Sequence, residues 1–394
     1  MPVASPLDVV EEVVRRRGGD LVELSHAIHA EPELAFDEHR SCAKAQQLVA
    51  ERGFEITARA GGLDTAFRAD FGSGPLVVGI CAEYDALPEI GHACGHNIIA
   101  ASAVGTALAL SEVADDLGLT VSLLGTPAEE AGGGKALMLQ AGTFDDVAVA
   151  VMVHPGPTDI AAARSLALSE AIVRYLGKES HAAVAPFMGL NAADAVTVAQ
   201  VAIGLLRQQL APGQLMHGIV TDGGQAVNVI PGRATLQYAM RALESDSLRE
   251  LEGRMYACFA AGALAAGCEY EIETPAPAYD ELKPDRWLAE TCRDEMRRLG
   301  REPVTPEVEA ALPMGSTDMG NVTQVLPGIH PVIGVDAGGA TVHQRAFAAA
   351  AAGPSADRAV VDGAIMLART VVQLAQDSGE RDRVLAAQET RARG

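Results

Sequence analysis

The chain of 394 residues has few aromatic side chains, little positive charge and no cluster of closely spaced cysteines. Aromatic residues make up 4% of it, and 30 basic residues stand against 52 acidic ones, so the formal net charge is −22. Nucleic-acid binding requires basic stripes, and this balance therefore argues against a nucleic-acid partner. A strongly negative chain is instead soluble and attracts cations.

The cysteines are scattered, without the short spacings of a disulfide framework; they are Cys42, Cys81, Cys94, Cys258, Cys268 and Cys292. In a chain of this length, such usage favours reduced thiols and a cytoplasmic localisation. The N-terminus shows no basic-then-apolar signal pattern. No apolar run reaches the roughly 18 residues of a membrane span without polar interruption, and we expect no membrane association.

The length of the chain and the order of its predicted strands and helices indicate two domains in an α/β protein. A chain of 394 residues is too long for one ordinary core. We expect residues 1–166 and 276–394 to form one discontinuous catalytic domain, with a central mixed sheet flanked by helices. Residues 167–275 read as strand, helix, strand, strand, helix, strand, which is typical of an inserted α+β domain with helices on one face of a sheet.

Local patterns set further expectations within these domains. Near the N-terminus we predict one helix over residues 7–17 and a second helix after Gly19. Residues 146–153 read as a buried strand, and residues 227–241 as another single strand. The tail of residues 377–394 is highly charged, and we expect it to be frayed.

Metal-capable side chains come directly after a short apolar run that reads as a buried strand. They are Glu83, Asp85, His92, Cys94 and His96, and an Ala-rich helical pattern follows them. The end of a strand before a helix is where open α/β sheets place their sites. Cys94 and His96 flank a glycine, so both side chains can reach one point. Thiolate and imidazole suit zinc, and imidazole also suits manganese, cobalt or nickel.

Two later strands are expected to lead to similar groups. Residues 119–124 precede Glu129 and Glu130, and residues 146–153 precede His154. Each feature also has an ordinary structural explanation. Adjacent acids are common in the first turn of a helix, and a histidine after an apolar run often belongs to the core. Two adjacent carboxylates can also divide two tasks, one binding a metal and the other transferring a proton.

Together with His343, these groups could hold one or two divalent ions beside a free carboxylate. A bound ion lowers the pKa of water toward about 7 and polarises a carbonyl, while a nearby glutamate carries the proton. Asp85 would orient an imidazole that binds the metal. Ser316 and Asp318 lie in a glycine-containing loop that could line the pocket. The residues thus predict metal-assisted hydrolysis, with zinc or manganese as the ion and a slight preference for zinc from the thiolate.

Several motifs in order make the chain resemble the M20 family of metallopeptidases and amidohydrolases over nearly its whole length. They are HAEPEL at 29–34, EYDALP at 83–88, HACGHN at 92–97, TPAEE at 126–130, HP at 154–155, GKESHAA at 177–183, NVIP at 228–231 and HQRAF at 343–347. The resemblance points to the branch with aminoacyl hydrolases, auxin-conjugate hydrolases and aminobenzoyl-glutamate hydrolase subunits.

This resemblance implies a role for each matching residue of the catalytic domain. The ligands of a two-metal site would be Cys94, His96, Glu130, His154 and His343. Glu129 would be the general base, which later gives its proton to the leaving amine. Asp85 would set the orientation of a ligand. Asn97 departs from the pattern, because many members of this branch carry Asp there, so a supporting contact is neutral in this chain.

In the inserted domain the resemblance implies three further functional positions. His181 matches a histidine that reaches the partner's active site in related dimers. Asn228 and Arg241 match positions that hold the substrate carboxylate, and a guanidinium suits that task because it can bind both oxygens. Each also has a plainer explanation, as a turn residue for His181 and Asn228 or as a surface ion-pair partner for Arg241.

The expected function is hydrolysis of the amide bond of N-acyl or N-aminoacyl amino acids, including dipeptides, by a metal-activated water with Glu129 as general base. Two alternatives stay open. One is a deacetylase or carbamoyl-type amidohydrolase on the same site, and the other is a non-catalytic binding subunit that retains the fold. The resemblance also implies a homodimer formed through the inserted lid domain, and some relatives need a paralogous partner subunit.

Overall fold

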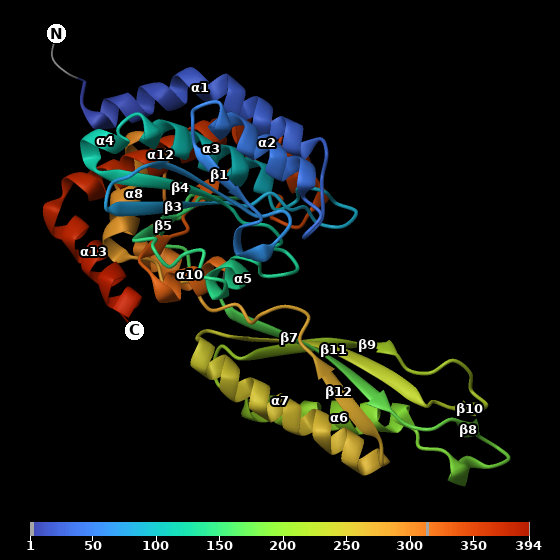
Figure 1. Ribbon diagram of the computed structural model, residues 1–394. Coiled ribbons are helices and arrows are strands. Elements are labelled where there is room, and N and C mark those ends of the chain that lie inside the picture. Colours follow the sequence, from blue (N-terminus) through green and yellow to red (C-terminus); the bar gives the residue numbers. More distant parts are fainter. Residues whose placement is uncertain (1–3, 313–314, 394) are drawn as a thin grey trace. The chain divides into compact units, whose positions relative to one another are not determined.

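The chain forms two compact units in the computed structural model, which describes residues 4–312 and 315–393 (Figure 1). The first unit comprises the chain up to Arg164 together with the chain from Leu282 onward. The second comprises Ser165–Glu281. The second unit is therefore an insertion in the sequence of the first.

A mixed sheet forms the centre of the first unit, with the strand order β1-β2-β4-β3-β5-β13 in the described part of the chain. Its strands are β1 (Glu55–Ala58), β2 (Phe67–Gly72), β3 (Leu76–Ala82), β4 (Leu119–Gly125), β5 (Val149–Val151) and β13 (Gly328–Ile329). β3 is parallel to β4 and β5, and β5 is parallel to β13, whereas β2 is antiparallel to both β1 and β4. The predicted α/β class with a central mixed sheet is confirmed.

Helices cover both faces of this sheet (Figure 1). The longer ones are α1 (Pro6–His29), α2 (His39–Ala50), α3 (His96–Ser111), α8 (Arg286–Arg298), α12 (Pro354–Gln376) and α13 (Ser378–Arg393). The shorter ones are α4 (Ala114–Leu117), α5 (Gly134–Gln140), α9 (Pro306–Ala311), α10 (Met319–Val325) and α11 (Arg345–Ala350), with a 3-10 turn η1 (Ala60–Gly62). A short parallel pair, β6 (His154–Gly156) and β14 (Val332–Gly334), lies outside the main sheet.

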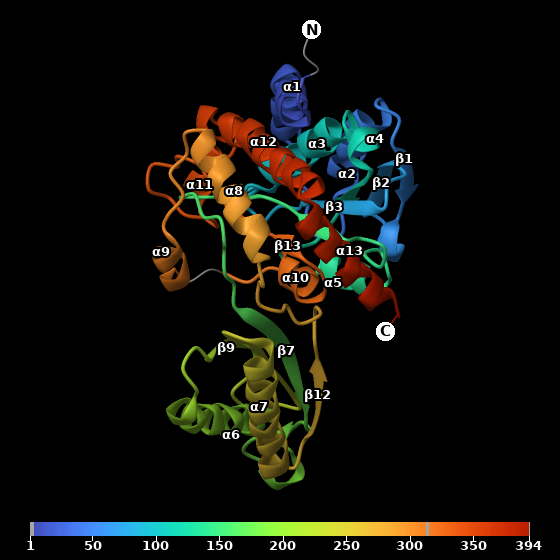
Figure 2. The same ribbon diagram turned by 90° about the vertical axis from the view of Figure 1, so that its left-hand side faces the viewer.

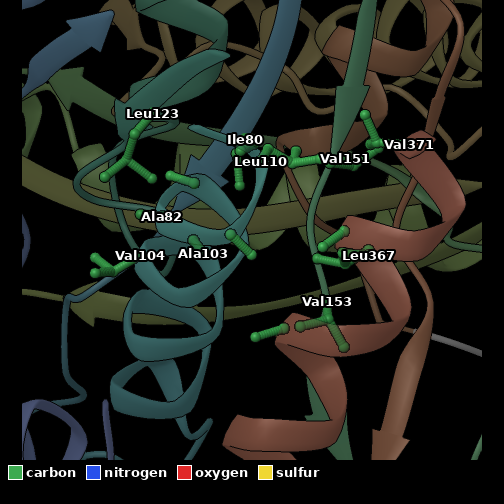
Figure 3. Close-up of a cluster of buried hydrophobic side chains, with 14 of the residues drawn as sticks. Ile80, Ala82, Ala103, Val104, Leu110, Leu123, Val151, Val153, Leu367 and Val371 are labelled. Carbon is green, nitrogen blue, oxygen red and sulfur yellow. The ribbon is translucent and has the colours of Figure 1, made fainter. Parts of the chain in front are cut away.

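Strand β3 is buried on both faces, and every one of its residues is buried. Ile80 and Ala82 pack in the core with α1, α3 and α12, whereas Val77 and Cys81 pack with α5 and α10. Figure 3 shows Ile80 among side chains from β4, β5, α3 and α12. A strand covered on both sides reads as an unbroken apolar run, which is why the sequence predicted it.

Helix α12 is long and apolar. By length and composition it could cross a membrane, but 78% of its most apolar window is buried inside the protein. It packs against α1, α3 and α8, and Figure 2 shows it beside α8. Its apolar surface is therefore used by the core of the first unit.

The second unit is an antiparallel sheet in the order β12-β7-β11-β9, with α6 and α7 packed on it (Figure 2). Its elements are β7 (Ala167–Leu176), β9 (Leu215–Asp222), β11 (Arg233–Ala242), β12 (Glu269–Glu273), α6 (Ala192–Leu206) and α7 (Ser245–Ala266). A short antiparallel pair joins β8 (Ser180–His181) to β10 (Val229–Ile230), and two 3-10 turns are η2 (Pro186–Met188) and η3 (Arg207–Gln209). β7 alternates between buried and half-buried residues, as a strand with one covered face does.

Helix α1 corrects the prediction of two helices separated near Gly19. It runs without a break through Gly18 and Gly19. A glycine costs a helix about 1 kcal/mol relative to alanine, but packing of an apolar face outweighs that loss in a folded protein. Here Val14 and Leu21 are fully buried on either side of the glycines, and α1 packs on α3 and α12.

The charged tail is also not frayed as predicted, because it forms helix α13 up to Arg393. Arg381 donates hydrogen bonds to the carbonyl oxygens of Leu117 and Ala375, and Val384 is fully buried. A composition rich in charge therefore conceals anchoring contacts, since Arg391 also donates a hydrogen bond to the carbonyl oxygen of Val147 and Arg383 pairs with Asp285.

Two strand predictions are wrong in their bounds. Residues 227–241 form two strands, β10 and β11, because Pro231 lies between them and a proline lacks the N–H that a ladder needs. Residues 146–153 do not form one strand up to His154. β5 ends at Val151, and His154 begins β6, which pairs with β14.

Helix α3 is enclosed so tightly that Gly105 has no room for a methyl group. A Cβ on Gly105 would lie 2.7 Å from Leu21 Cδ1 and 2.9 Å from Ala364 Cβ. We expect Gly105→Ala to lower the free energy of unfolding by about 1–3 kcal/mol through overpacking. Gly19→Ala, where a Cβ meets nothing within 4 Å, should raise it by about 0.5–1 kcal/mol. Urea unfolding followed by circular dichroism measures both, and a Gly105→Ala variant as stable as the wild type would contradict this packing.

Candidate metal centre

The parallel strands β3, β4 and β5 bring polar side chains to one edge of the sheet. Asp85 follows β3, Glu129 and Glu130 follow β4, and His154 follows β5. The carboxyl ends of parallel strands meet at the same edge, where α/β sheets place their sites. Side chains that are far apart in the sequence are therefore close together in the fold.

Gly95 shapes the loop that carries the cysteine and the first histidine. Its φ is +78°, and it precedes His96, the first residue of α3. A Cβ at this position would lie 2.6 Å from Pro155 Cγ. Glycine allows both the left-handed backbone and the close approach. The loop thereby presents Cys94 and His96 to the residues that follow β5.

Cys94 belongs to two groups of possible ligands. Its Sγ is 3.5 Å from His154 Nε2 and 3.6 Å from His343 Nε2. One group consists of Cys94, His96 and His154, and the other of Cys94, Glu130 and His343; within each group the ligand atoms lie within 4.8 Å of one another. Ligand atoms that bind the same zinc ion at about 2.0–2.3 Å lie at such distances from one another. The structure therefore brings together all five residues that were predicted as ligands.

The Nδ1 atoms of two histidines are held by hydrogen bonds. His96 Nδ1 lies 2.8 Å from Asp85 Oδ1, and His154 Nδ1 lies 2.7 Å from the carbonyl oxygen of Pro155. These contacts leave each Nε2 facing the ligand groups. Asp85 also accepts a hydrogen bond of 2.9 Å from the main-chain nitrogen of Glu130. Asp85 thus contacts two of the predicted ligands.

Buried polar atoms without protein partners support a bound cation. Among the described residues, His96 Nε2 and Glu130 Oε1 have no hydrogen-bond partner although both atoms are buried. A buried polar atom in a native protein is ordinarily paired, or it contacts water or an ion. A lone pair on nitrogen and a carboxylate oxygen are both suited to a divalent metal. The donor set therefore fits two ions of the zinc or manganese kind.

His343 reaches the site from the other end of the chain. Its main-chain nitrogen donates a 2.9 Å hydrogen bond to the carbonyl oxygen of Ala93, and its φ is +66°, in the left-handed region. Its Nε2 lies 3.4 Å from Glu130 Oε2, and its side chain is 55% exposed. Residues held in this backbone region cluster at functional sites.

The site carries more negative charge than the protein alone neutralises. Burial raises the pKa of Glu129 well above its usual value, and repulsion from Glu83 and Glu130 raises it further. Burial also raises the pKa of Glu130 and of the Cys94 thiol. The protons that Glu130 and Cys94 retain are the ones that a metal ion would displace on binding.

The two buried histidines respond to this environment in opposite ways. Burial lowers the pKa of His154 to about 4, so its imidazole is neutral and has a lone pair for a metal. Burial also opposes a charge on His96, but the carboxylate of Asp85 outweighs it and raises the pKa of His96. A cation beside His96 would favour its neutral form, since like charges repel.

The remaining predicted residues lie in the second unit, where the structure brings two of them together. His181 pairs with Val229 across β8 and β10, and Ala182 donates a 2.9 Å hydrogen bond to the carbonyl oxygen of Asn228. His181 is exposed, and its Nδ1 accepts hydrogen bonds from the next turn. Arg241 is half-buried in β11. The roles of these three residues stay predictions.

The sequence analysis missed a buried lysine close to the site. Lys135 Nζ lies 2.6 Å from Glu83 Oε1 and 2.5 Å from Asp318 Oδ1, and all three side chains are fully buried. Glu83 was noted only as metal-capable and Asp318 only as a possible pocket residue. The sequence did contain a signal for this lysine: Lys135 directly follows Gly132–Gly134, shortly after the two adjacent glutamates.

A buried histidine near the ligands was also missed. His330 is 4% exposed, its ring centre lies 5.4 Å from that of His154, and burial lowers its pKa to about 3. Neither ring nitrogen has a hydrogen-bond partner in the described parts of the chain. No local pattern marks this histidine, because it precedes Pro331 in an ordinary apolar segment.

Metal binding at this site should strengthen as the pH rises. Because Cys94 and Glu130 have raised pKa values, each releases a proton when an ion binds, and the apparent affinity should change about tenfold per pH unit for each proton released. Calorimetric titration with Mn²⁺ between pH 6 and 8 measures this. Glu130→Gln, which has one proton fewer to release, should bind more weakly with a shallower pH dependence. A pH-independent affinity would contradict the assignment.

Comparisons with known proteins identify the family of the chain. A family model described as Peptidase family M20/M25/M40 matches residues 79–372. The Xaa-Arg dipeptidase of Mus musculus is 39% identical over 355 residues, covering 83% of this chain and 81% of that protein. The N-acetyl-L-cysteine deacetylase of Bacillus subtilis is 27% identical over 360 residues, covering 83% of each chain.

The fold agrees as well. The crystal structure of a dinuclear metal-binding peptidase of Bacillus subtilis from the M20 family superposes with a TM-score of 0.68 at 22% identity, covering 92% of this chain and 99% of that one. The family model spans well over half of the chain, and the mouse relative matches most of it. The chain therefore belongs to peptidase family M20/M25/M40 and is a hydrolase that acts on amide or peptide bonds.

Proposed function

We propose that the protein hydrolyses the amide bond of N-acyl or N-aminoacyl amino acids, including dipeptides, at a centre of two divalent ions. The observation that carries this proposal is the sharing of Cys94 by two ligand groups next to Glu129. The relatives named as an Xaa-Arg dipeptidase and as an N-acetyl-L-cysteine deacetylase support a linear amide as substrate.

The ions would be held by the five residues of the two groups, Cys94, His96, Glu130, His154 and His343. Zinc and manganese both suit this mixture of thiolate, imidazole and carboxylate. When bound, such ions polarise the scissile carbonyl and lower the pKa of the attacking water. Asp85 keeps the Nε2 of His96 turned toward them through its 2.8 Å contact with Nδ1.

Glu129 is the proposed general base. Its Oε2 lies 3.9 Å from His96 Nε2, so the carboxylate adjoins the ligands. It takes a proton from the attacking water and passes it to the nitrogen of the leaving amine. Burial and the neighbouring carboxylates raise the pKa of Glu129, and an upward shift of this kind is how enzymes adapt a carboxylate to general acid–base catalysis.

A strained turn aims Glu129 at the site. Ala128, the preceding residue, has a φ of +59°, and its main-chain nitrogen donates a 2.8 Å hydrogen bond to the carboxylate of Glu38. Glu38 is fully buried and also accepts a 2.7 Å hydrogen bond from Thr65. A backbone in this region persists where its surroundings hold it.

The second unit is proposed to bind the substrate carboxylate and to form a homodimer. Asn228 and Arg241 would hold the carboxylate, with Arg241 offering a planar fork for both oxygens, and His181 would stabilise the transition state in the partner's site. β9 is an edge strand of its sheet and exposes Leu215, Ile219 and Val220. Uncovered apolar edge strands readily pair with another chain.

All six cysteines are free thiols, which supports the proposed cytoplasmic location.

Replacing Glu129 by glutamine should stop turnover and leave metal binding intact. The amide cannot take the proton, and removal of a general base costs about 10²–10⁴-fold in kcat. Steady-state kinetics measures the loss, and elemental analysis checks that the metal content equals that of the wild type. Glu51→Gln, at an exposed position after α2, is the matched control. Turnover at wild-type rates by Glu129→Gln would remove this residue from the mechanism.

A substrate panel tests the reaction class itself. Dipeptides ending in arginine or lysine, N-acetyl amino acids and N-carbamoyl amino acids should be compared after loading with Zn²⁺ or Mn²⁺. We expect the dipeptides to be cleaved fastest. Preference for the acetylated or carbamoylated compounds would favour the deacetylase or carbamoyl-type alternative. Inactivity toward the whole panel by metal-loaded protein would favour the non-catalytic subunit.

The purified protein should be a dimer that depends on β9. Ile219 is 61% exposed on this edge strand, and a charge there would be buried at the proposed interface at high cost. We expect light scattering after size exclusion to show a dimer for the wild type and a monomer for Ile219→Lys. Leu264→Lys, at an 86% exposed apolar position on α7, should remain dimeric. A monomeric wild type would refute the dimer.

A further inference from the structure

A buried ammonium group adjoins the proposed general base. Lys135 Nζ contacts Glu83 Oε1 at 2.6 Å and Asp318 Oδ1 at 2.5 Å, and all three side chains are fully buried. Carboxylate oxygens of Glu83, Glu129 and Asp318 lie within 4.8 Å of one another. The ammonium therefore lies against two of three carboxylates that crowd one small space.

Such a group of carboxylates needs a positive charge among them. Like charges in a buried site repel strongly, and they stay ionised together only when an opposite charge is close. Removing one partner from a buried ion pair leaves an uncompensated charge, which is far more costly than losing a surface pair. Lys135 supplies the positive charge from the protein itself, in the position that a metal ion would take between the carboxylates of Glu83 and Asp318.

The backbone before Lys135 is built to bring it there. After Glu129 and Glu130 the chain turns through Gly133, whose φ is +66°. A Cβ on Gly134 would lie 1.9 Å from the carbonyl oxygen of Pro127, so only glycine fits this close approach. The main-chain nitrogen of Lys135 then donates a 2.8 Å hydrogen bond to Asp318 Oδ2.

The same contacts extend to the metal ligands. Glu83 Oε2 lies 3.5 Å from His96 Nε2, and Glu129 Oε2 lies 3.9 Å from the same nitrogen. Glu83 therefore lies between Lys135 and a ligand of the proposed ions. If Glu83 were not held by Lys135, its carboxylate could turn to an ion and displace the ligands or Glu129.

We propose that Lys135 is a positioning residue, an internal cation that holds Glu83 and Asp318 and thereby fixes Glu129 beside the metal ligands. This inference rests on the proposed function, because it assigns Lys135 a purpose in presenting the general base. Lys135 does not touch the substrate and transfers no proton. It keeps the carboxylates of Glu83 and Asp318 away from the divalent ions and keeps the carboxylate of Glu129 in place.

Lys135→Met tests the role in turnover, since methionine has a similar length and no charge. Displacement of a catalytic group by about 1 Å can cost about 10²-fold in rate, and we expect a loss of that size in kcat with little change in KM. Lys44→Met is the control: it removes a partly exposed lysine of the first unit that pairs with Glu31, and it should keep wild-type kinetics. Wild-type kcat in Lys135→Met would overturn the inference.

Crystals soaked with Mn²⁺ give a readout that needs no turnover. In Lys135→Met we expect anomalous scattering from an additional ion between Glu83 and Asp318, together with a displaced Glu129 carboxylate. The wild type should show no ion between these two residues. Lys135→Met with Asp318→Asn, which removes one charge of each sign, should fold if the single variant does not, and it should lack the additional ion.

The outcomes separate the inference from the proposed function. If the wild type cleaves amides and Glu129→Gln does not, but Lys135→Met has wild-type kcat and an unmoved Glu129, the inference fails and the proposed function stands. If the wild type cleaves none of the substrates, the proposed function fails, and diffraction still decides whether Lys135 replaces a cation. An Mn²⁺ ion between Glu83 and Asp318 in the wild type would overturn the inference directly.

Discussion

Parallel pairing of β3 with β4 and β5 is the constraint on which the rest of the site depends. It directs Asp85, the two adjacent glutamates and His154 to the same edge of the sheet. The strands themselves are held by apolar contacts on both faces, with α1, α3 and α12 on one and α5 and α10 on the other. The cost of assembling so many polar groups is therefore offset by burial of the apolar strands that carry them.

The second governing feature is an excess of negative charge in a buried place. Glu83, Glu129, Glu130 and Asp85 all lie close to His96, and repulsion among such groups must be relieved by cations. The chain meets this need in two ways. Lys135 neutralises the carboxylates on one side, whereas Cys94 and the histidines offer lone pairs to divalent ions on the other. The fixed ammonium and the side chains that could hold metal ions thus lie in separate places.

The two units divide different kinds of residue between them. The first contains every member of the two ligand groups and the proposed base. The second is an antiparallel sheet with helices packed on it and an exposed apolar edge strand. Its His181 and Asn228 lie on paired segments of a small ladder. The proposed chemistry is therefore assigned to the first unit, and the proposed binding of substrate and partner to the second.

The sequence by itself determined the α/β class, the buried strands β3 and β4 and the candidate ligands, because apolar runs and motifs such as HACGHN and TPAEE are local and carry their chemistry in residue type. It was misleading where packing overrides local preference, as in the unbroken helix through Gly19 and the ordered helix α13. It also could not reveal the contact of Lys135 with Glu83 and Asp318, which joins segments far apart in the chain. Only the tertiary structure decides such contacts, because they arise from strand order and loop closure, and no local pattern encodes which distant charges will meet.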